Sequence, residues 1–423
     1  MDIYQKFGSY MEKQIVKQPD QARKKLIVAY RAKQGIDRMF TDKRVPASKK
    51  YLTKLAMDTM IQVLSKPEQS AMTSLFVPSE PLAAAGITPY SPEAMSSFMT
   101  GSKIERPFLQ KTSEEGMPDS MCSYHRVFLG AADTGVCPEA PFLIYTNLAC
   151  DGNMITFPYL MDKYGIPGFF IDVPYEKTKE SVQFVADQLR EMNVFIEDYS
   201  HKKITQEALK QRILTADETL KNYRKYLHAC KTHYIGGTLT HEMYQVFITH
   251  MLLGTNQAYQ YSRMLLSDIL KGEPTGDRTK LLWIHMMPFF SEPMKELFEF
   301  SDRAVVQASD IVYDACFSLD AEKPFESMAK RMVYSGFNGS PEQRIKNALD
   351  AAEYTGADGC VIFSHWGCKT TIGAAGLIQE ELGKKGLETL ILDGDGCNPA
   401  GNSDGQTKTR LEAFLEMLKE KER

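Results

Sequence analysis

Short apolar runs alternate with helical patterns in two separate parts of the chain, and this alternation most constrains the fold. The first part runs from about residue 70 to 200, and the second begins at about residue 280. The candidate strands are 141–146 (PFLIYT), 168–173 (GFFIDV), 280–285 (KLLWIH), 310–313 (DIVY) and 360–364 (CVIFS). Strands that alternate with helices build βαβ units around a parallel sheet. The sequence therefore predicts an α/β fold with two parallel-sheet domains.

The segments outside these two parts have helical patterns. Residues 1–66 are charged, with apolar residues at helical spacing. After Thr205, a suitable helix cap, apolar residues recur at steps of three and four from Leu209 to Leu227. We expect an N-terminal helical segment (1–66), a first α/β domain (67–202), a helical connection (203–275) and a second α/β domain (276–423). A final helix should pack on the second sheet through Leu411, Phe414, Leu415 and Leu418.

Three cysteines occur in polar turns that precede predicted helices. Cys122 lies in MCSYHR, Cys150 in NLACDGN and Cys368 in SHWGCKTT. Backbone N–H groups and the dipole at the start of a helix lower the pKa of a nearby thiol and favour an anionic ligand set. Turns that follow strands in open α/β sheets lie at the carboxyl ends of the strands, where ligands bind. We therefore expect two half-sites that face each other, with thiolates that suit an iron-sulfur cluster.

The other cysteines have plainer interpretations. Scattered thiols in a long chain are commonly small buried hydrophobes, and we assign Cys137, Cys230, Cys316 and Cys360 to that class. Zinc is an alternative for clustered thiols, but zinc sites usually carry Cys-x-x-Cys spacing and the sequence has none. Residues 386–393 (GLETLILD) indicate the end of a helix, then a strand, then Asp393. Cys397, in the Gly-Asp-Gly-Cys turn after this strand, stays open: it could be a fourth cluster ligand or a neighbour of the cofactor.

Composition excludes two classes of partner. The chain has 50 basic and 54 acidic residues, a formal net charge of −4 and no basic run. This balance indicates neither a nucleic acid nor a membrane surface as a partner. No window approaches the roughly 18 uninterrupted apolar residues of a membrane span, and the initial MDIYQKF lacks the apolar core of a signal peptide. We expect a cytoplasmic protein.

Several motifs occur together after about residue 70. They are PSE (78–80) with AGITP (85–89), CS (122–123), NLAC (147–150), SHWGCK (364–369), LDGDGC (392–397), and GQT (405–407) with TRLE (409–412). In these motifs the chain resembles the 2-hydroxyacyl-CoA dehydratases and the related benzoyl-CoA reductase subunits. The combination of HWGCK and LDGDGC is most similar to the larger (alpha) subunit, as in the D-component of 2-hydroxyglutaryl-CoA dehydratase.

The resemblance implies two flavodoxin-like domains with a [4Fe-4S] cluster in the cleft between them. Three cysteines that match Cys122, Cys150 and Cys368 would hold the cluster and leave its fourth iron open to water or substrate. The implied reaction is loss of water from an (R)-2-hydroxyacyl-CoA to give the enoyl-CoA, through a ketyl radical formed by one low-potential electron. An open cluster also implies oxygen sensitivity and an anaerobic setting, such as amino-acid fermentation.

The resemblance also implies partners. One is a smaller homologous subunit with its own cluster, in a heterodimer. The other is a separate ATP-hydrolysing iron-sulfur activator, because this chain has no Gly-x-x-x-x-Gly-Lys-Ser/Thr phosphate loop. Two alternatives stay open: a reductase of the same family with a larger cluster, acting on an aromatic acyl-CoA or another small molecule, and a non-catalytic subunit that relays electrons.

Two residues are candidates for catalysis. Glu93, which follows Tyr-Ser-Pro, matches a family carboxylate near the substrate and could be an acid, a base or a hydroxyl contact. His365, in the HWGCK element, is the second candidate. Characterised dehydratases place a Ser near the position of Leu75, so this sequence leaves the acyl chain of the substrate open.

Overall fold

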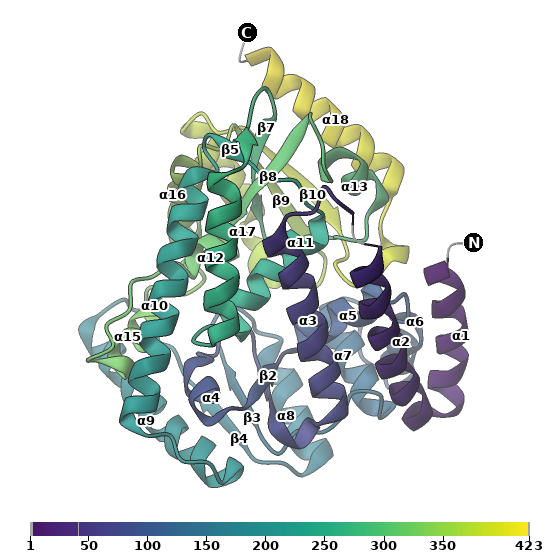
Figure 1. Cartoon of the computed structure of the whole chain (residues 1–423), viewed down its shortest axis with the longest axis vertical. Helices are drawn as coiled ribbons and strands as arrows, with labels where there is room; N and C mark the ends of the chain where they lie inside the picture. Colours follow the sequence, from purple (N-terminus) through teal and green to yellow (C-terminus); the bar gives the residue numbers. More distant parts are fainter. Residues whose placement is uncertain (1–2, 41, 422–423) are drawn as a thin grey trace.

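Two parallel sheets, each covered by helices, form the core of the protein (Figure 1). The computed structural model describes residues 3–40 and 42–421. The first sheet lies in the lower part of the molecule in Figure 1 and the second in the upper part. The predicted α/β fold with two parallel sheets is confirmed. Residues 1, 2 and 41 of the expected N-terminal segment, and residues 422 and 423, lie outside the described residues.

The first sheet contains four parallel strands in the order β2-β1-β3-β4. They are β1 (Ser70–Thr73), β2 (Thr88–Tyr90), β3 (Leu143–Thr146) and β4 (Gly168–Ile171). The helices of this region are α4 (Glu80–Ala85), α5 (Pro92–Gly101), α6 (Arg106–Glu114), α7 (Ser123–Asp133), α8 (Asn153–Tyr164) and α9 (Lys179–Ser200). All residues of β3 are buried, as expected for a parallel strand covered on both faces.

The second sheet contains four parallel strands in the order β10-β9-β7-β8. They are β7 (Thr279–Ile284), β8 (Ala304–Ser309), β9 (Gly359–His365) and β10 (Thr389–Gly394). Its region also contains α13 (Glu292–Phe298), α14 (Asp310–Asp314), α15 (Pro324–Val333), α16 (Pro341–Thr355), α17 (Lys369–Lys384) and α18 (Asp404–Lys421). Numbered along the chain, both sheets have the strand order 2-1-3-4, which is the flavodoxin-like order without its fifth strand.

One predicted strand is wrong. Residues 310–313 belong to helix α14, and the strand of this region, β8, ends just before it at Ser309. Ser309 has extended backbone dihedrals, and its hydroxyl accepts a hydrogen bond from the Val312 N–H at 3.2 Å, which caps the helix. The composition of a short apolar run does not distinguish a strand from a helix. Here the Ser309 cap favours a helix.

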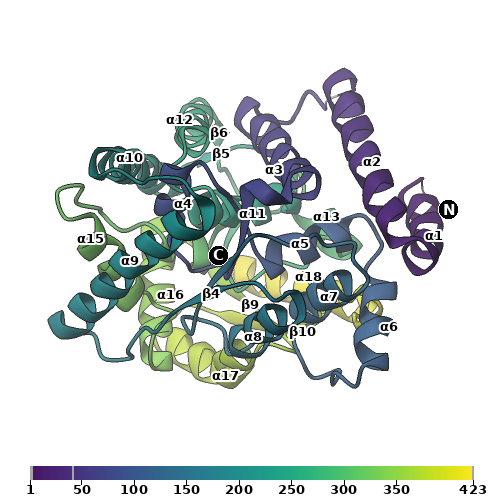
Figure 2. The same cartoon turned by 90° about the horizontal axis from the view of Figure 1, so that it is seen from below.

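Further helices flank the two sheets. The N-terminal residues form α1 (Ile3–Lys17), α2 (Pro19–Met39) and α3 (Ala47–Ser65), which lie side by side in both Figure 1 and Figure 2. The connection between the sheets contains α10 (Gln206–Ala229), α11 (Leu239–Val246), the π-helical turn η2 (Phe247–Met251) and α12 (Asn256–Leu270). Short elements complete the chain: η1 (Pro67–Gln69), β5 (His233–Tyr234), β6 (Glu273–Pro274) and η3 (Pro399–Gly401).

The predicted helix after Lys203 is confirmed as α10. The Thr205 hydroxyl accepts a hydrogen bond from the Ala208 N–H at 3.1 Å, and the apolar positions from Leu209 to Leu227 are buried. The apolar face of α18 is also buried and contacts β7 and β10, as expected. Across residues 3–40 and 42–421, none of the helices combines the length and apolar character needed to cross a membrane.

The strand order fixes where a ligand can bind. In each sheet the direction of the strand order reverses at the first strand. This switch point lies between β1 and β3 in the first sheet and between β7 and β9 in the second. At such a switch point the loops after the two neighbouring strands run in opposite directions. A crevice therefore forms at the carboxyl ends of these strands. The segments that follow these four strands begin with Ser74, Asn147, His285 and Trp366. Residues from these segments line a common cavity.

Candidate functional site

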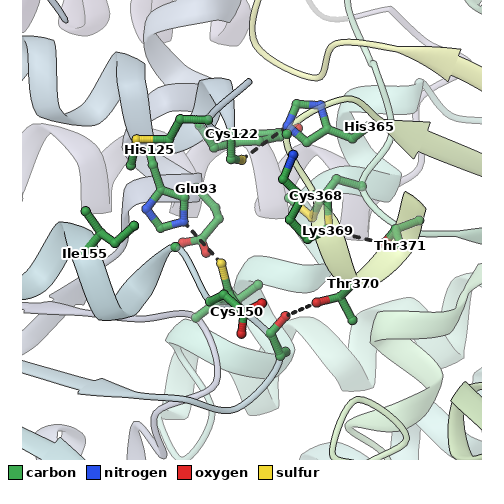
Figure 3. Close-up of a pocket in the computed structure, with 18 of the residues that line it drawn as sticks. Glu93, Cys122, His125, Cys150, Ile155, His365, Cys368, Lys369, Thr370 and Thr371 are labelled. Atoms are coloured by element: carbon green, nitrogen blue, oxygen red, sulfur yellow. Dashed lines mark hydrogen bonds between the residues drawn. The ribbon is translucent and has the colours of Figure 1, made fainter. Parts of the chain in front are cut away.

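Cys122, Cys150 and Cys368 line one cavity of about 530 Å³ (Figure 3). Cys122 immediately precedes α7, Cys368 immediately precedes α17, and Cys150 lies in the turn between β3 and α8. All three residues are of intermediate exposure, and their thiols are free. The structure therefore brings the three predicted cysteines together from turns that lie far apart in the sequence.

The first turn of α17 contacts the turns that carry the other two cysteines. The Thr370 hydroxyl donates to the Ala149 carbonyl at 3.4 Å, and Lys369 Nζ donates to the Ser120 carbonyl at 3.5 Å. Ala149, directly before Cys150, has a φ of 68°, in the left-handed region that costs a non-glycine residue roughly 1 kcal/mol. Strained backbone of this kind persists where its surroundings hold it, and here it orients Cys150.

Each of the three sulfurs has a polar side-chain partner. Cys122 Sγ lies 3.2 Å from His365 Nε2, Cys150 Sγ lies 3.3 Å from His125 Nε2, and Cys368 Sγ lies 3.3 Å from the Thr371 hydroxyl. Figure 3 shows these contacts around the cavity. Hydrogen bonds to cluster ligands orient the thiolates and tune the group they hold.

The protonation of His365 follows from its partners. Its Nδ1 accepts a hydrogen bond from the Gly396 N–H at 3.0 Å, so the proton of a neutral ring is on Nε2 and points to Cys122. Burial lowers the pKa of His365 and of His125 to about 4, so both rings are neutral at pH 7. Both His365 nitrogens are thus engaged, which favours a role in holding Cys122.

The sequence predicts lowered pKa values for the three thiols, and this prediction is wrong for Cys122 and Cys150. Burial is the largest cause and raises the pKa of Cys122 well above its usual value, with added repulsion from the Cys150 and Cys368 thiolates. Burial also raises the pKa of Cys150. Backbone N–H groups at the start of α7 do lower the Cys122 pKa, as expected from the helix, but desolvation outweighs them. These thiols need a positive partner to ionise.

Glu93 lies in the first turn of α5 and lines the same cavity. Burial raises the pKa of its carboxyl group, which favours the protonated form. Its Oε2 atom is buried and has no hydrogen-bond partner among the described residues. In Figure 3 its carboxyl group lies beside His125 and Cys150. The group can therefore give a proton to, or bind, an oxygen that enters beside Cys150.

A buried charged network supports Cys368. Arg344 donates to Asp310 Oδ2 from Nε at 3.1 Å and from Nη2 at 3.0 Å, and its Nη1 donates to the Thr371 hydroxyl at 2.8 Å. The side chains of Arg344 and Asp310 are 3% and 0% exposed. Because a guanidinium only donates, Thr371 keeps its own proton available for a Cys368 thiolate.

His285, directly after β7, has an unusual backbone and also lines the cavity. Its φ is 81°, and its N–H donates to Asp310 Oδ1 at 2.9 Å. The imidazole ring stacks on His365 with 5.9 Å between centroids. Its Nδ1 is buried and has no partner within the described chain. Asp310 thus fixes both His285 and Arg344 at the edge of the site.

Cys397 lies apart from the other three cysteines. It is fully buried and does not belong to the residues that line the cavity. Its N–H donates to Asp395 Oδ1 at 2.9 Å, and its carbonyl accepts from the Thr100 hydroxyl at 3.3 Å. These contacts are those of a packed turn. A cluster in the cavity would therefore take its thiolates from Cys122, Cys150 and Cys368.

The donor set fits a cluster better than a single metal ion. Within residues 3–40 and 42–421, His, Cys, Asp and Glu side chains do not gather in groups of three that could hold one ion. Thiolates of a cubane bind different irons, so they can lie farther apart than ligands of one ion. Three thiols around a cavity of about 530 Å³ match that arrangement. They would leave one iron of a [4Fe-4S] cluster without a cysteine.

Sequence reasoning did not assign roles to His125, Thr371 and Arg344. His125 and Thr371 each lie three residues after a cavity cysteine, at the start of a helix. For Thr371 this spacing is a usable local signal, because it contacts Cys368 itself. His125 contacts Cys150 and not Cys122, so its partner does not follow from the spacing. Arg344 and Asp310 lie 34 residues apart, and only the packing of α16 against α14 brings them together.

Comparison with known proteins supports a family assignment. Residues 74–418 match the family model described as 2-hydroxyglutaryl-CoA dehydratase, D-component. The chain is 21% identical over 368 residues to the (R)-phenyllactyl-CoA dehydratase alpha subunit of Clostridium sporogenes, with 81% of this chain and 87% of that one covered.

Two further relatives are also alpha subunits. Lactoyl-CoA dehydratase subunit alpha of Anaerotignum propionicum is 23% identical over 381 residues, covering 81% of this chain and 88% of that one. The (R)-2-hydroxyisocaproyl-CoA dehydratase alpha subunit of Clostridioides difficile is 22% identical over 357 residues, covering 78% and 86%. The match begins directly after β1 and extends over the other strands of both sheets and all three cavity cysteines. The chain belongs to the 2-hydroxyglutaryl-CoA dehydratase D-component family.

Proposed function

We propose that this chain is the larger subunit of an oxygen-sensitive (R)-2-hydroxyacyl-CoA dehydratase. The observation that supports this most is the convergence of Cys122, Cys150 and Cys368 on one cavity at the switch points of both sheets. The reaction removes a hydroxyl from C2 and a hydrogen from C3 of the acyl group, giving the enoyl-CoA and water. A ketyl radical of the thioester makes the hydroxyl a better leaving group and the C3 hydrogen acidic.

A [4Fe-4S] cluster bound by the three cysteines would supply a low-potential electron and an open coordination position. His365, His125 and Thr371 orient the sulfurs through the hydrogen bonds described above. The smaller subunit and the ATP-dependent activator belong to this proposal, because the sequence has no Gly-x-x-x-x-Gly-Lys-Ser/Thr phosphate loop with which to drive the electron transfer.

Glu93 is the residue we propose for proton transfer. Burial raises the pKa of its carboxyl group, which favours the protonated form. In that form it can donate a proton to the departing hydroxyl, which then leaves as water. After the loss of its proton it becomes a carboxylate beside the cavity, ready to accept a proton in turn.

Iron analysis of protein purified without oxygen tests the proposal. We expect about four irons and four sulfides per chain, lost in Cys368→Ala and kept in Cys397→Ala. Cys397 is a matched control because it is also a thiol near the end of a strand but lies outside the cavity. Absence of iron under strict anaerobiosis would overturn the proposal, and about eight irons per chain would favour a reductase instead.

A further inference from the structure

Besides the cysteines, the cavity is lined by a group of apolar side chains, which we call its inner end. Its walls are Leu75, Phe76, Met286, Ile311 and Phe337. Leu75 and Ile311 are only 7% and 4% exposed. The rings of Phe76 and Phe337 lie 5.2 Å apart. These residues come from the segments after β1, β7, β8 and α15, so both halves of the molecule contribute to the inner end.

The positive charges around the inner end are already engaged. All three nitrogen groups of Arg344 donate to Asp310 or Thr371, and the Phe337 ring lies 4.7 Å from the guanidinium. Arg331 donates to both carboxylate oxygens of Glu80, at 2.7 and 3.0 Å.

Among the remaining basic groups, Lys177 and His250 do not line the cavity, and Lys369 lines it directly after Cys368. Lys177 donates to the carbonyls of Tyr334 and Ser335. The His250 ring packs edge-on against Phe76 with 5.0 Å between centroids, and burial lowers its pKa to about 3. Lys369 lies on the cysteine side, where it binds the Ser120 carbonyl. A carboxylate in the inner end would thus lose its hydration without gaining an ion pair within the described residues.

We propose that the inner end binds the acyl side chain of the substrate, and that this side chain is a branched or aromatic hydrocarbon. The inference rests on the proposed function and specifies its substrate. Apolar contacts with Phe76, Phe337 and Ile311 would bind such a group as its surface leaves water. A side chain that ends in a carboxylate would be rejected, because each paired arginine would have to give up a buried partner.

Binding of two matched thioesters to the anaerobic, cluster-loaded complex tests this inference. (R)-2-hydroxyisocaproyl-CoA and (R)-2-hydroxyglutaryl-CoA have acyl chains of similar length, but one ends in two methyl groups and the other in a carboxylate. Calorimetry without reductant or ATP measures affinity alone. We expect the hydrocarbon thioester to bind about 100-fold more tightly, a difference of about 3 kcal/mol. Equal affinities, or a preference for the carboxylate, would overturn the inference while leaving the proposed function intact.

Failure of the proposed function gives a different result. In that case neither thioester would bind more tightly than coenzyme A alone, and the inference would fall with it. Phe76→Leu tests whether the acyl side chain contacts this residue. The variant should lower affinity for the isocaproyl thioester about 10-fold. Its affinity for lactoyl-CoA, whose side chain is one methyl group, should stay within about twofold of the wild-type value. Phe142→Leu, a buried aromatic residue outside the cavity, should change neither affinity. Equal losses for both thioesters in Phe76→Leu would contradict the assignment of this end.

Discussion

Gly367 packs directly against the backbone of Cys122. A Cβ atom at position 367 would lie 2.1 Å from Cys122 Cα and 2.5 Å from Cys122 N, far inside normal contact. The turn that contains Cys368 is therefore in direct backbone contact with Cys122. No side chain fits between them, because backbone atoms cannot rotate away as the tip of a flexible side chain can. The distance between the two sulfurs depends on this glycine.

Gly367→Ala should disrupt the cysteine site more than the fold. We expect iron content to fall by at least half, because the methyl group must separate the turn of Cys368 from Cys122. Gly373→Ala, in α17, is the matched control: its Cβ would meet nothing within 4 Å, and Ala favours a helix over Gly by about 1 kcal/mol. Anaerobic iron analysis and circular dichroism measure both effects. Full iron content in Gly367→Ala would refute the close-packing argument.

Thr371→Val should lower the reduction potential of the bound cluster. Valine has the shape of threonine but removes the hydroxyl that lies 3.3 Å from Cys368 Sγ. A hydrogen bond to a ligand sulfur withdraws electron density, so its loss makes reduction harder. Potentiometric titration followed by electron paramagnetic resonance measures the shift. Thr371→Ser keeps the hydroxyl and should keep the wild-type potential; the same potential in all three proteins would exclude this role of Thr371.

The parallel sheets were largely predictable, because their central strands are apolar runs of characteristic length. The runs at 141–146, 280–285 and 360–364 became β3, β7 and β9, which are buried on both faces. β1 (SAMT) and β2 (TPY) have too few apolar residues to stand out. Their positions depend on pairing with β3 and with each other, which no local pattern encodes.

The positions of the cysteine turns could be predicted from the topology of the sheets. The residues that stabilise these turns could not. Turns after parallel strands meet at one edge of the sheet, so Cys150 and Cys368 had to face a ligand crevice. The pairing of Arg344 with Asp310 depends on how α16 packs against α14 beside the second sheet. The direction of the Cys122 pKa also depended on burial, which the helix-start pattern does not reveal.

Glu105 should make stability fall as the pH rises from about 4.5 to 7. Burial raises its folded-state pKa from 4.5 to about 7, and its Oε2 has no partner among the described residues. Between these pH values Glu105 ionises in the unfolded chain but stays protonated in the folded chain. The free energy of unfolding therefore falls by up to about 3 kcal/mol. Below the unfolded pKa the carboxyl group is neutral in both states, and its full contribution is present.

Glu105→Gln should remove this part of the pH dependence. Urea unfolding at pH 5 and pH 8 measures it as the difference in free energy of unfolding between the variant and wild type. We expect the variant to gain stability relative to wild type at pH 8 and to gain little at pH 5. Glu114→Gln, at an exposed position of the same helix region, should show no such difference. An unchanged pH dependence in Glu105→Gln would mean that the buried carboxyl does not titrate in this range.

Glu80 and Arg331 form a buried ion pair between α4 and α15, which follow β1 and β8 in the two halves of the chain. Glu80 is 0% exposed and Arg331 14%, and both guanidinium Nη atoms donate to the carboxylate. Glu80→Gln removes the carboxylate and leaves a buried cation without its partner. We expect a loss of about 3–5 kcal/mol in free energy of unfolding, measured by urea denaturation.

A double-mutant cycle distinguishes loss of this pair from loss of packing. Glu80→Gln combined with Arg331→Met removes both charges, so it should be more stable than the sum of the two single losses predicts, by about 1–3 kcal/mol. Glu380→Gln breaks the pair with Lys384 on α17, where both side chains are more than half exposed, and should cost less than about 1 kcal/mol. Strict additivity at Glu80 and Arg331 would show that their charges do not act on each other. Coupling would instead mean that the PSE motif, whose last residue is Glu80, joins the two halves that form the cavity.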